Sequence, residues 1–166
     1  LRAARVAFRL EPNATSRIDL ELNLDSRKED LNLALFDPRD RTTYSDVNQT
    51  SMFDSLGIEH TLSQYYIKVP SSQPDDGNTW AVLNSFDGQF FGNDGTPLYI
   101  QNGADWEPLT AANWDPANPI SFRETGAPPY AGSGATLGDY LSDTATGTAP
   151  ADTQGLAQAT LFFNTQ

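Results

Sequence analysis

Two runs of strand-favouring residues joined by a tight polar turn constrain this chain more than any other feature. Residues 50–53 and 58–69 carry aromatic and branched side chains, and the turn Asp54–Gly57 between them ends in glycine. This pattern predicts a β-hairpin. A third run at 79–86 follows a polar stretch at 70–77. The three runs together predict a central antiparallel β-meander.

The apolar side of the second run changes along its length. Leu62 and Tyr66 share one parity, whereas Tyr65, Ile67 and Val69 share the other. Successive side chains of a strand point to opposite faces of a sheet. The pattern therefore indicates either a β-bulge in this strand or a strand that is buried on both faces.

Alternation with a period of two also occurs outside the meander. Residues 5–10 and 16–24 alternate apolar with polar side chains, which is typical of half-buried strands. Residues 31–36 form a shorter apolar alternation that fits either a strand or loop packing. Two short strand candidates follow at 98–101 and 120–123, between segments rich in turn residues.

The last part of the chain predicts a long loop and a final strand. Residues 124–155 are rich in Gly and Pro and predict a surface loop. Residues 156–163 alternate as a strand does. Four side chains are candidate anchors of the loop: Tyr130, Leu137, Tyr140 and Leu141. The fold class predicted for the whole is all-β, an antiparallel β-barrel or sandwich-like domain with a central meander and long loops.

Charge and composition exclude several classes of protein. The formal net charge of −12 argues against nucleic acid as a partner, because phosphate neutralisation needs clustered Lys and Arg. No apolar run approaches the roughly 20 residues that cross a bilayer, so no membrane partner is expected. Cysteine is absent, which excludes structural disulfides and cysteine-bound zinc. The chain lacks a starting Met and is expected to be a piece of a longer protein.

No catalytic or metal-binding pattern emerges, and no enzyme activity, cofactor or metal is predicted. His60 is the only histidine, with Ser55 and Ser63 near it in sequence, and a hydrogen-bonded structural role is favoured over a catalytic one. The acidic stretches Asp75–Gly77 and Asn93–Gly95 lack the ligand spacing of an EF-hand and are interpreted as turns.

The three tryptophans leave an alternative open. Trp80 shares its strand parity with Val82, which favours a core position. Trp106 and Trp114 lie in segments rich in Asp and Asn. An exposed pair there, near Tyr99, fits either a sugar-binding platform or contact with a neighbouring protein.

Four motifs, in order, resemble the outer domain of bacterial flagellar hook proteins. They are Phe53–Gly57 (Phe-Asp-Ser-Leu-Gly), His60–Leu62, Tyr65–Lys68 and Asn78–Trp80 (Asn-Thr-Trp). Weaker similarities are the alternating segment at 16–24, Asp37-Pro38 with Tyr44, and the segment Ala159–Thr165. The resemblance implies a D2-like outer β domain without the terminal helical segments of that family.

The resemblance also implies a domain division and a function. Residues 1–25 are expected to connect from an inner domain, and 26–166 to form the outer domain. The expected function is that of a structural subunit of the hook, the extracellular flexible tube between motor rod and filament. Its expected partners are identical subunits and the cap, rod and hook–filament junction proteins, and the isolated piece is expected to be monomeric. Loops within 89–155 are expected to contact neighbouring subunits.

Two alternatives stay open from the sequence. One is a carbohydrate-binding or adhesin-like β module that uses Trp106 and Trp114. The other is a different axial protein of the flagellum, such as a rod or hook-associated subunit.

Overall fold

The computed structural model describes residues 14–70, 78–91, 97–121, 136–139 and 141. Within these residues two antiparallel sheets and a few short helical turns account for the regular structure. The predicted all-β class is confirmed. No helix among the described residues has the length and apolar character needed to cross a membrane.

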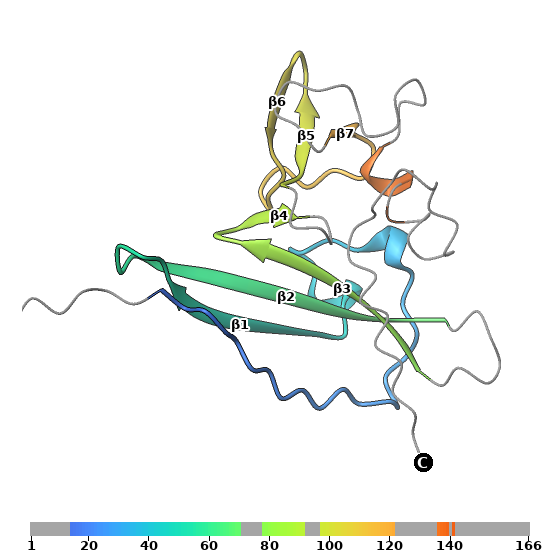
Figure 1. Cartoon of the computed structure of the whole chain (residues 1–166). Helices are drawn as coiled ribbons and strands as arrows, with labels where there is room; N and C mark the ends of the chain where they lie inside the picture. The colour runs from blue at the N-terminus through green and yellow to red at the C-terminus, as the bar shows by residue number, and fades with distance from the viewer. Residues whose placement is uncertain (1–13, 71–77, 92–96, 122–135, 140, 142–166) are drawn as a thin grey trace, which may run out of the picture.

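The predicted meander is the first of the two sheets (Figure 1). Its four strands run in the order β1-β2-β3-β4, with bounds Asp46–Phe53, Glu59–Val69, Thr79–Phe86 and Gln89–Phe91. The sequence identified the first three strands and missed β4. Asp87 and Gly88 join β3 to β4 with φ values of 49° and 86°. Two consecutive positive φ values are typical of a type I′ turn, for which Asp-Gly is well suited.

The strand β2 is buried on both faces, and the alternative of a bulge is wrong. Its pairing with β1 continues without interruption from Glu59 to Tyr66, and its pairing with β3 continues from Leu62 to Val69. Tyr66 is buried on one face, while Ile67 and Val69 are buried on the other. The apolar residues of β2 change parity because its two faces pack in two different hydrophobic clusters, and the register of the strand does not change.

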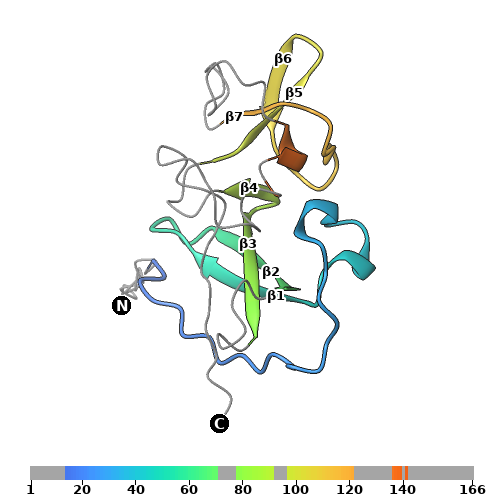
Figure 2. The same cartoon turned by 90° about the vertical axis from the view of Figure 1, so that its right-hand side faces the viewer.

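The second sheet has three strands in the order β6-β5-β7: Asp105–Pro108, Tyr99–Asn102 and Ile120–Ser121. The two strand candidates at 98–101 and 120–123 fall on β5 and β7, whereas β6 was not predicted. In two perpendicular views this sheet lies above the four-stranded sheet, and the two do not close into a barrel (Figures 1 and 2). The sandwich-like alternative therefore describes the architecture better.

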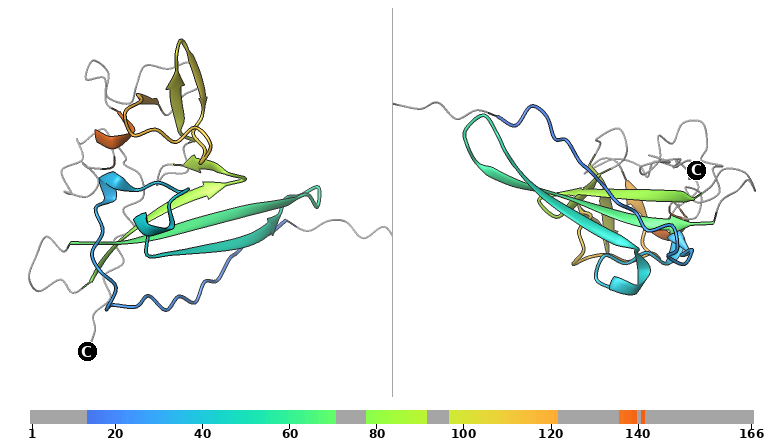
Figure 3. Two further views of the ribbon diagram at one scale, coloured as in Figure 1. Left: turned by 180° about the vertical axis from the view of Figure 1, so that it is seen from behind. Right: turned by 90° about the horizontal axis from the view of Figure 1, so that it is seen from below.

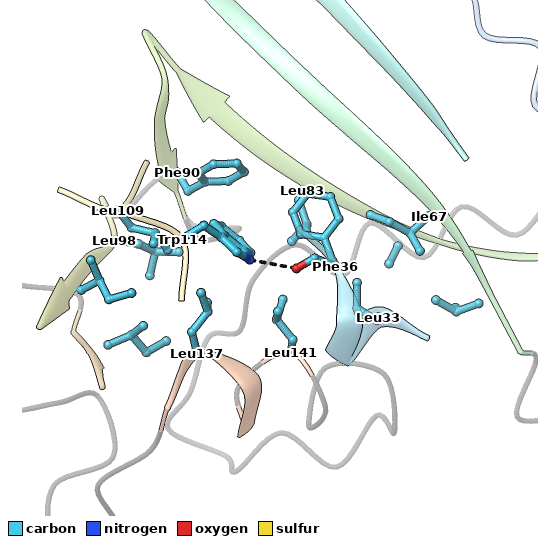
Figure 4. Packing of buried hydrophobic residues seen from close by; sticks show 14 residues of the cluster. Leu33, Phe36, Ile67, Leu83, Phe90, Leu98, Leu109, Trp114, Leu137 and Leu141 are labelled. Carbon is cyan, nitrogen blue, oxygen red and sulfur yellow. Dashed lines mark hydrogen bonds between the residues drawn. The ribbon is translucent and has the colours of Figure 1, made fainter. Parts of the chain in front are cut away.

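The main core lies between the two sheets and a segment that precedes β1 (Figure 4). Phe36 is at its centre, with edge-on ring contacts to Tyr65, Phe90 and Trp114. The indole Nε1 of Trp114 donates a 2.8 Å hydrogen bond to the backbone oxygen of Phe36. The fully buried aliphatic residues around these rings include Leu33, Ile67, Leu83, Leu98, Ile100, Leu109, Ile120, Leu137 and Leu141.

The segment 31–36 forms a short 3-10 helix, η1 (Leu33–Leu35), and the strand alternative for it is wrong. Leu33 and Phe36 are buried while Leu35 is 67% exposed. Residues three apart lie on the same side of a 3-10 helix, which explains this burial pattern. A second 3-10 helix, η2 (Arg41–Thr43), leads into β1.

Residues 14–24 form an extended arm on the other face of the first sheet, seen from below in Figure 3. The arm is not a strand, contrary to the prediction for 16–24. Leu22 and Leu24 nevertheless pack on a small cluster of Tyr66, Trp80 and Val82. Ile18 is also half-buried, whereas Leu20 is 40% exposed, so the alternation of the arm is matched only in part by burial, without a ladder of hydrogen bonds.

Two anchors predicted within 124–155 are confirmed: Leu137 and Leu141 are completely buried in the main core. The other two, Tyr130 and Tyr140, lie outside the described residues. So do the strands predicted at 5–10 and 156–163.

We expect Leu137→Ala to lower the free energy of unfolding by about 2–5 kcal/mol, since it removes a fully buried side chain and leaves a cavity. Leu35→Ala makes the same chemical change at an exposed site and should alter stability by about 0.5 kcal/mol or less. Urea denaturation measures both. Equal effects of the two substitutions would contradict the placement of Leu137 in the core.

Candidate functional site

Two turns meet at one end of the four-stranded sheet, and His60 joins them. Its ring stacks on Phe86, with 5.0 Å between the centroids and 24° between the planes. Nδ1 lies 2.6 Å from Asp87 Oδ2, and Nε2 lies 3.6 Å from Asp54 Oδ2. Antiparallel pairing places the β1–β2 and β3–β4 turns at the same end, so residues 27 positions apart in the sequence come into contact.

Asp54 organises the β1–β2 turn. Its Oδ1 accepts hydrogen bonds of 2.8 Å from the backbone N–H groups of both Leu56 and Ile58. Gly57, at φ 79°, donates its N–H to the Asp54 carbonyl at 3.0 Å. The bond from the Ile58 N–H is the main cause that lowers the Asp54 pKa, with smaller contributions from Leu56 and His60.

Asp87 fixes the other turn. Its Oδ2 faces His60, and its Oδ1 accepts a 2.8 Å hydrogen bond from the Thr61 N–H. The hydrogen bond with His60 lowers the pKa of Asp87, and the backbone bond of Thr61 lowers it further. The same hydrogen bond is the largest cause that raises the pKa of His60, followed among the raising contributions by Asp54. The cluster favours an imidazolium held between two carboxylates, which we call the histidine clamp (His60, Asp54, Asp87).

Of the two serines near His60 in sequence, Ser55 is exposed in the β1–β2 turn, and Ser63 lies on the other face of the sheet. Ser63 is buried and accepts a hydrogen bond from Gln49 Nε2. Its odd position along β2 places it on the face opposite to His60. Both imidazole nitrogens face carboxylates, so the arrangement suits a structural link between two turns.

The described residues contain no group of three or more His, Cys, Asp or Glu side chains able to hold a metal ion. The acidic stretches at 75–77 and 93–95 lie outside these residues.

The structure separates the three tryptophans. Trp80 is buried against Tyr66 and Val82, as its parity indicated. Trp114 is also buried, so the alternative in which Trp106 and Trp114 form an exposed pair does not hold. Burial of the Trp114 indole is possible because its N–H is satisfied by the Phe36 carbonyl. Trp106 is half-buried on β6.

Three exposed apolar residues near the histidine clamp were not predicted from the sequence. Phe53, Leu56 and Ile58 are large apolar residues left exposed at the end of the β1–β2 hairpin. The available signal was Leu56, an apolar residue in the middle of a polar turn, flanked by two further apolar residues.

A family model matches most of the chain. Residues 23–166 match the family described as "Flagellar basal body protein FlaE D2 domain". No curated protein and no solved structure matches the chain.

We predict that the imidazole of His60 titrates above its ordinary pKa of 6.5. Because the charged form is favoured in the folded state, the resulting stabilisation is complete below the unfolded-state pKa and is lost as pH rises through the folded one. Asp54 and Asp87 have lowered pKa values, so their contribution is lost as pH falls through those values. Since His60 is the only histidine, its ring protons report the titration in NMR spectra without ambiguity.

Asp87→Asn is the matched variant, because it keeps the shape of the side chain and removes the charge opposite Nδ1. The titration midpoint should then move down towards 6.5. The stability difference between the unsubstituted chain and His60→Gln should also be larger near about pH 5.5 than near about pH 8. A midpoint at or below 6.5 in the unsubstituted chain would contradict the clamp.

Proposed function

Because the chain belongs to the flagellar basal body protein FlaE D2 domain family, we propose that it is the outer domain of a flagellar hook subunit. Copies of the full protein would polymerise into the extracellular flexible tube that joins the motor rod to the filament. The match over residues 23–166 carries this proposal, because it spans most of the chain. The role of the domain is structural and not enzymatic.

Contacts between such subunits must form a helical polymer and still permit bending. Heterologous contacts that do not close generate an open helical assembly. Interfaces that are polar and of modest size suit sliding, since a large apolar interface resembles a cut domain core. The net charge of −12 and the polar turns of this domain support contacts of that kind.

The region proposed to contact neighbouring subunits is narrower than residues 89–155. Leu98, Ile100, Leu109 and Trp114 from that region are buried in the main core and are not available to a neighbour. The turn between β5 and β6, residues 102–105, is exposed throughout. In Figure 1 this hairpin projects from the top of the molecule, away from the four-stranded sheet.

The other proposed partners follow from the family. They are the neighbouring hook subunits, the hook cap during assembly, and the rod and hook–filament junction proteins at the two ends. The rival sugar-binding function loses its main support, because Trp114 is buried.

Deleting the full-length gene should abolish hooks, as seen by electron microscopy of cell envelopes. Persistence of normal hooks, or localisation of the protein to the rod or the hook–filament junction instead, would contradict the proposed function.

We further expect Asp105→Arg in the full-length protein to change hook curvature or stiffness without preventing assembly. The substitution reverses an exposed charge on the projecting hairpin. Glu29→Arg makes the same charge reversal at an exposed site before η1 and should leave hook shape unchanged. Curvature measured on micrographs of purified hooks checks both. Identical shapes for the two variants would refute the contact at the β5–β6 turn and leave the hook function itself standing.

A further inference from the structure

The only two lysines of the chain, Lys28 and Lys68, meet at the end of the first sheet opposite to the histidine clamp. Lys28 belongs to residues 25–31, which follow the extended arm and which we call the connector. Lys68 is the second-last residue of β2. Its Nζ donates a 2.8 Å hydrogen bond to the Lys28 backbone oxygen and lies 2.9 Å from Asp30 Oδ1. A side chain of β2 thus holds the connector at two points.

The connector holds the sheet in return. Lys28 Nζ donates a hydrogen bond to the backbone oxygen of Ser45, the residue before β1. Ser45 is itself joined to β2, because its N–H donates to the Tyr66 carbonyl at 2.8 Å and its Oγ accepts the Lys68 N–H at 3.0 Å. The Leu31 N–H donates to the Lys68 carbonyl at 2.7 Å. Side-chain and backbone bonds therefore tie the connector both to β2 and to the start of β1.

The burial of Lys68 depends on the connector. Lys68 pairs with Trp80 across β2 and β3, so its side chain lies on the same face of the sheet as those of Tyr66 and Trp80. This side chain is only 12% exposed, whereas that of Arg27 in the connector is 88% exposed. A charged ammonium is buried only where other polar groups replace its water. Here the connector supplies them, as a carboxylate and a carbonyl.

The contact lies where the chain crosses from one face of β2 to the other. Before the crossing, Leu22 and Leu24 pack on the face of Tyr66. After it, Leu31 and Leu33 pack in the main core on the opposite face. Figure 1 shows the arm below the first sheet and the chain rising past the end of that sheet to η1.

The arm has few other attachments to the sheet. In the described part of the chain, residues 16–24 form no backbone hydrogen bond with the first sheet. At the start of the arm, the exposed Thr15 donates its N–H to the Phe53 carbonyl at 2.9 Å, and its Oγ1 accepts the Phe53 N–H at 2.9 Å. Hydrogen bonds exposed to solvent open at little cost in free energy. The position of the arm therefore depends mainly on its other end, where the connector begins.

We propose that Lys28, Asp30 and Lys68 form a latch that fixes the direction in which the arm leaves the domain. We call these three residues the lysine latch. With the latch closed, the connector lies against the end of the first sheet, and the arm lies across the face formed by Tyr66 and Trp80. Loss of the Lys68 ammonium or of its carboxylate partner releases the connector, and the arm then moves relative to the sheet.

The latch itself does not depend on the hook function, whereas its mechanical meaning rests on that proposed function. Residues 1–25 are proposed to lead to an inner domain of the same subunit. A closed latch would then hold the outer domain at one angle to the inner domain. Bending of the polymer would be taken up between subunits and not within them.

A pair of spin labels on the complete 166-residue chain tests the latch. Ser26→Cys places one label on the exposed turn of the connector, and Glu59→Cys places the other on an exposed position of β2, in a chain with no other cysteine. Double electron–electron resonance then gives the distribution of distances between the labels, which should be narrow. Lys68→Met keeps a long unbranched side chain and removes the ammonium. It should widen the distribution about twofold or more, because a released segment samples the dimensions of a flexible chain.

Arg27→Met is the matched control. It removes one positive charge from the same connector, but the Arg27 guanidinium bonds to Asp25 within the connector and not to the sheet. Its distance distribution should stay narrow. Asp30→Asn is the second variant, and it should widen the distribution as Lys68→Met does. The Asp30 side chain is 46% exposed, so this substitution leaves the core untouched.

Near-UV circular dichroism of the buried aromatic residues checks that each variant is folded, and Asp30→Asn decides alone if Lys68→Met does not fold. An unchanged width in the folded latch variants would overturn the proposal. Equal widening in Arg27→Met would also overturn it, because the loss of positive charge and not the loss of the tie would then be the cause. Neither result bears on the hook function, which the gene deletion tests separately.

Discussion

Burial of β2 on both faces is the constraint on which the rest of the described structure depends. One face of the strand carries Ile67 and Val69 into the main core, and the other carries Tyr66 against the arm. Strands buried on both faces are typical of sheets covered on two sides. Here different structures cover the two faces. The second sheet and η1 cover one face, and the extended arm, which forms no ladder of hydrogen bonds, covers the other.

The main core depends on contacts between segments far apart in sequence. Trp114 reaches Phe36 across 78 positions and satisfies a backbone carbonyl there. Leu137 and Leu141 then close the same cluster from still later in the chain. Loops that supply buried side chains are part of the fold, so the described residues that follow β4 are needed to complete the core. This argues against treating residues 89–155 as dispensable surface.

How much of this could be predicted from sequence depends on whether the signal was local. Residues 79–86 were identified as a strand with the bounds that β3 has, because alternating apolar residues are flanked by turn residues. The strand β6 has only four residues and carries no comparable local signal. Trp114 could not be placed from the sequence because its neighbours Asn113 and Asp115 are polar, and nothing nearby in sequence reveals its acceptor.

In the candidate site, too, the local features could be predicted from the sequence and the contacts between distant residues could not. A hydrogen-bonded structural His60 was expected, but its partners required the register of two hairpins. From the sequence, Asp54 and Asp87 are indistinguishable from ordinary turn residues, and both do lie in turns. Their carboxylates serve two purposes, since each accepts backbone N–H groups and also faces the imidazole.

Such dual use suits a domain that must stay rigid within a bending polymer, as in the proposed hook. Bending then has to come from contacts between subunits, and those contacts remain labile if they are polar and exposed to water. Turns stiffened by charge-assisted hydrogen bonds keep their shape when a neighbour slides across them. The acidic turn residues of this chain would thus provide internal stiffness while keeping the outer surface well hydrated.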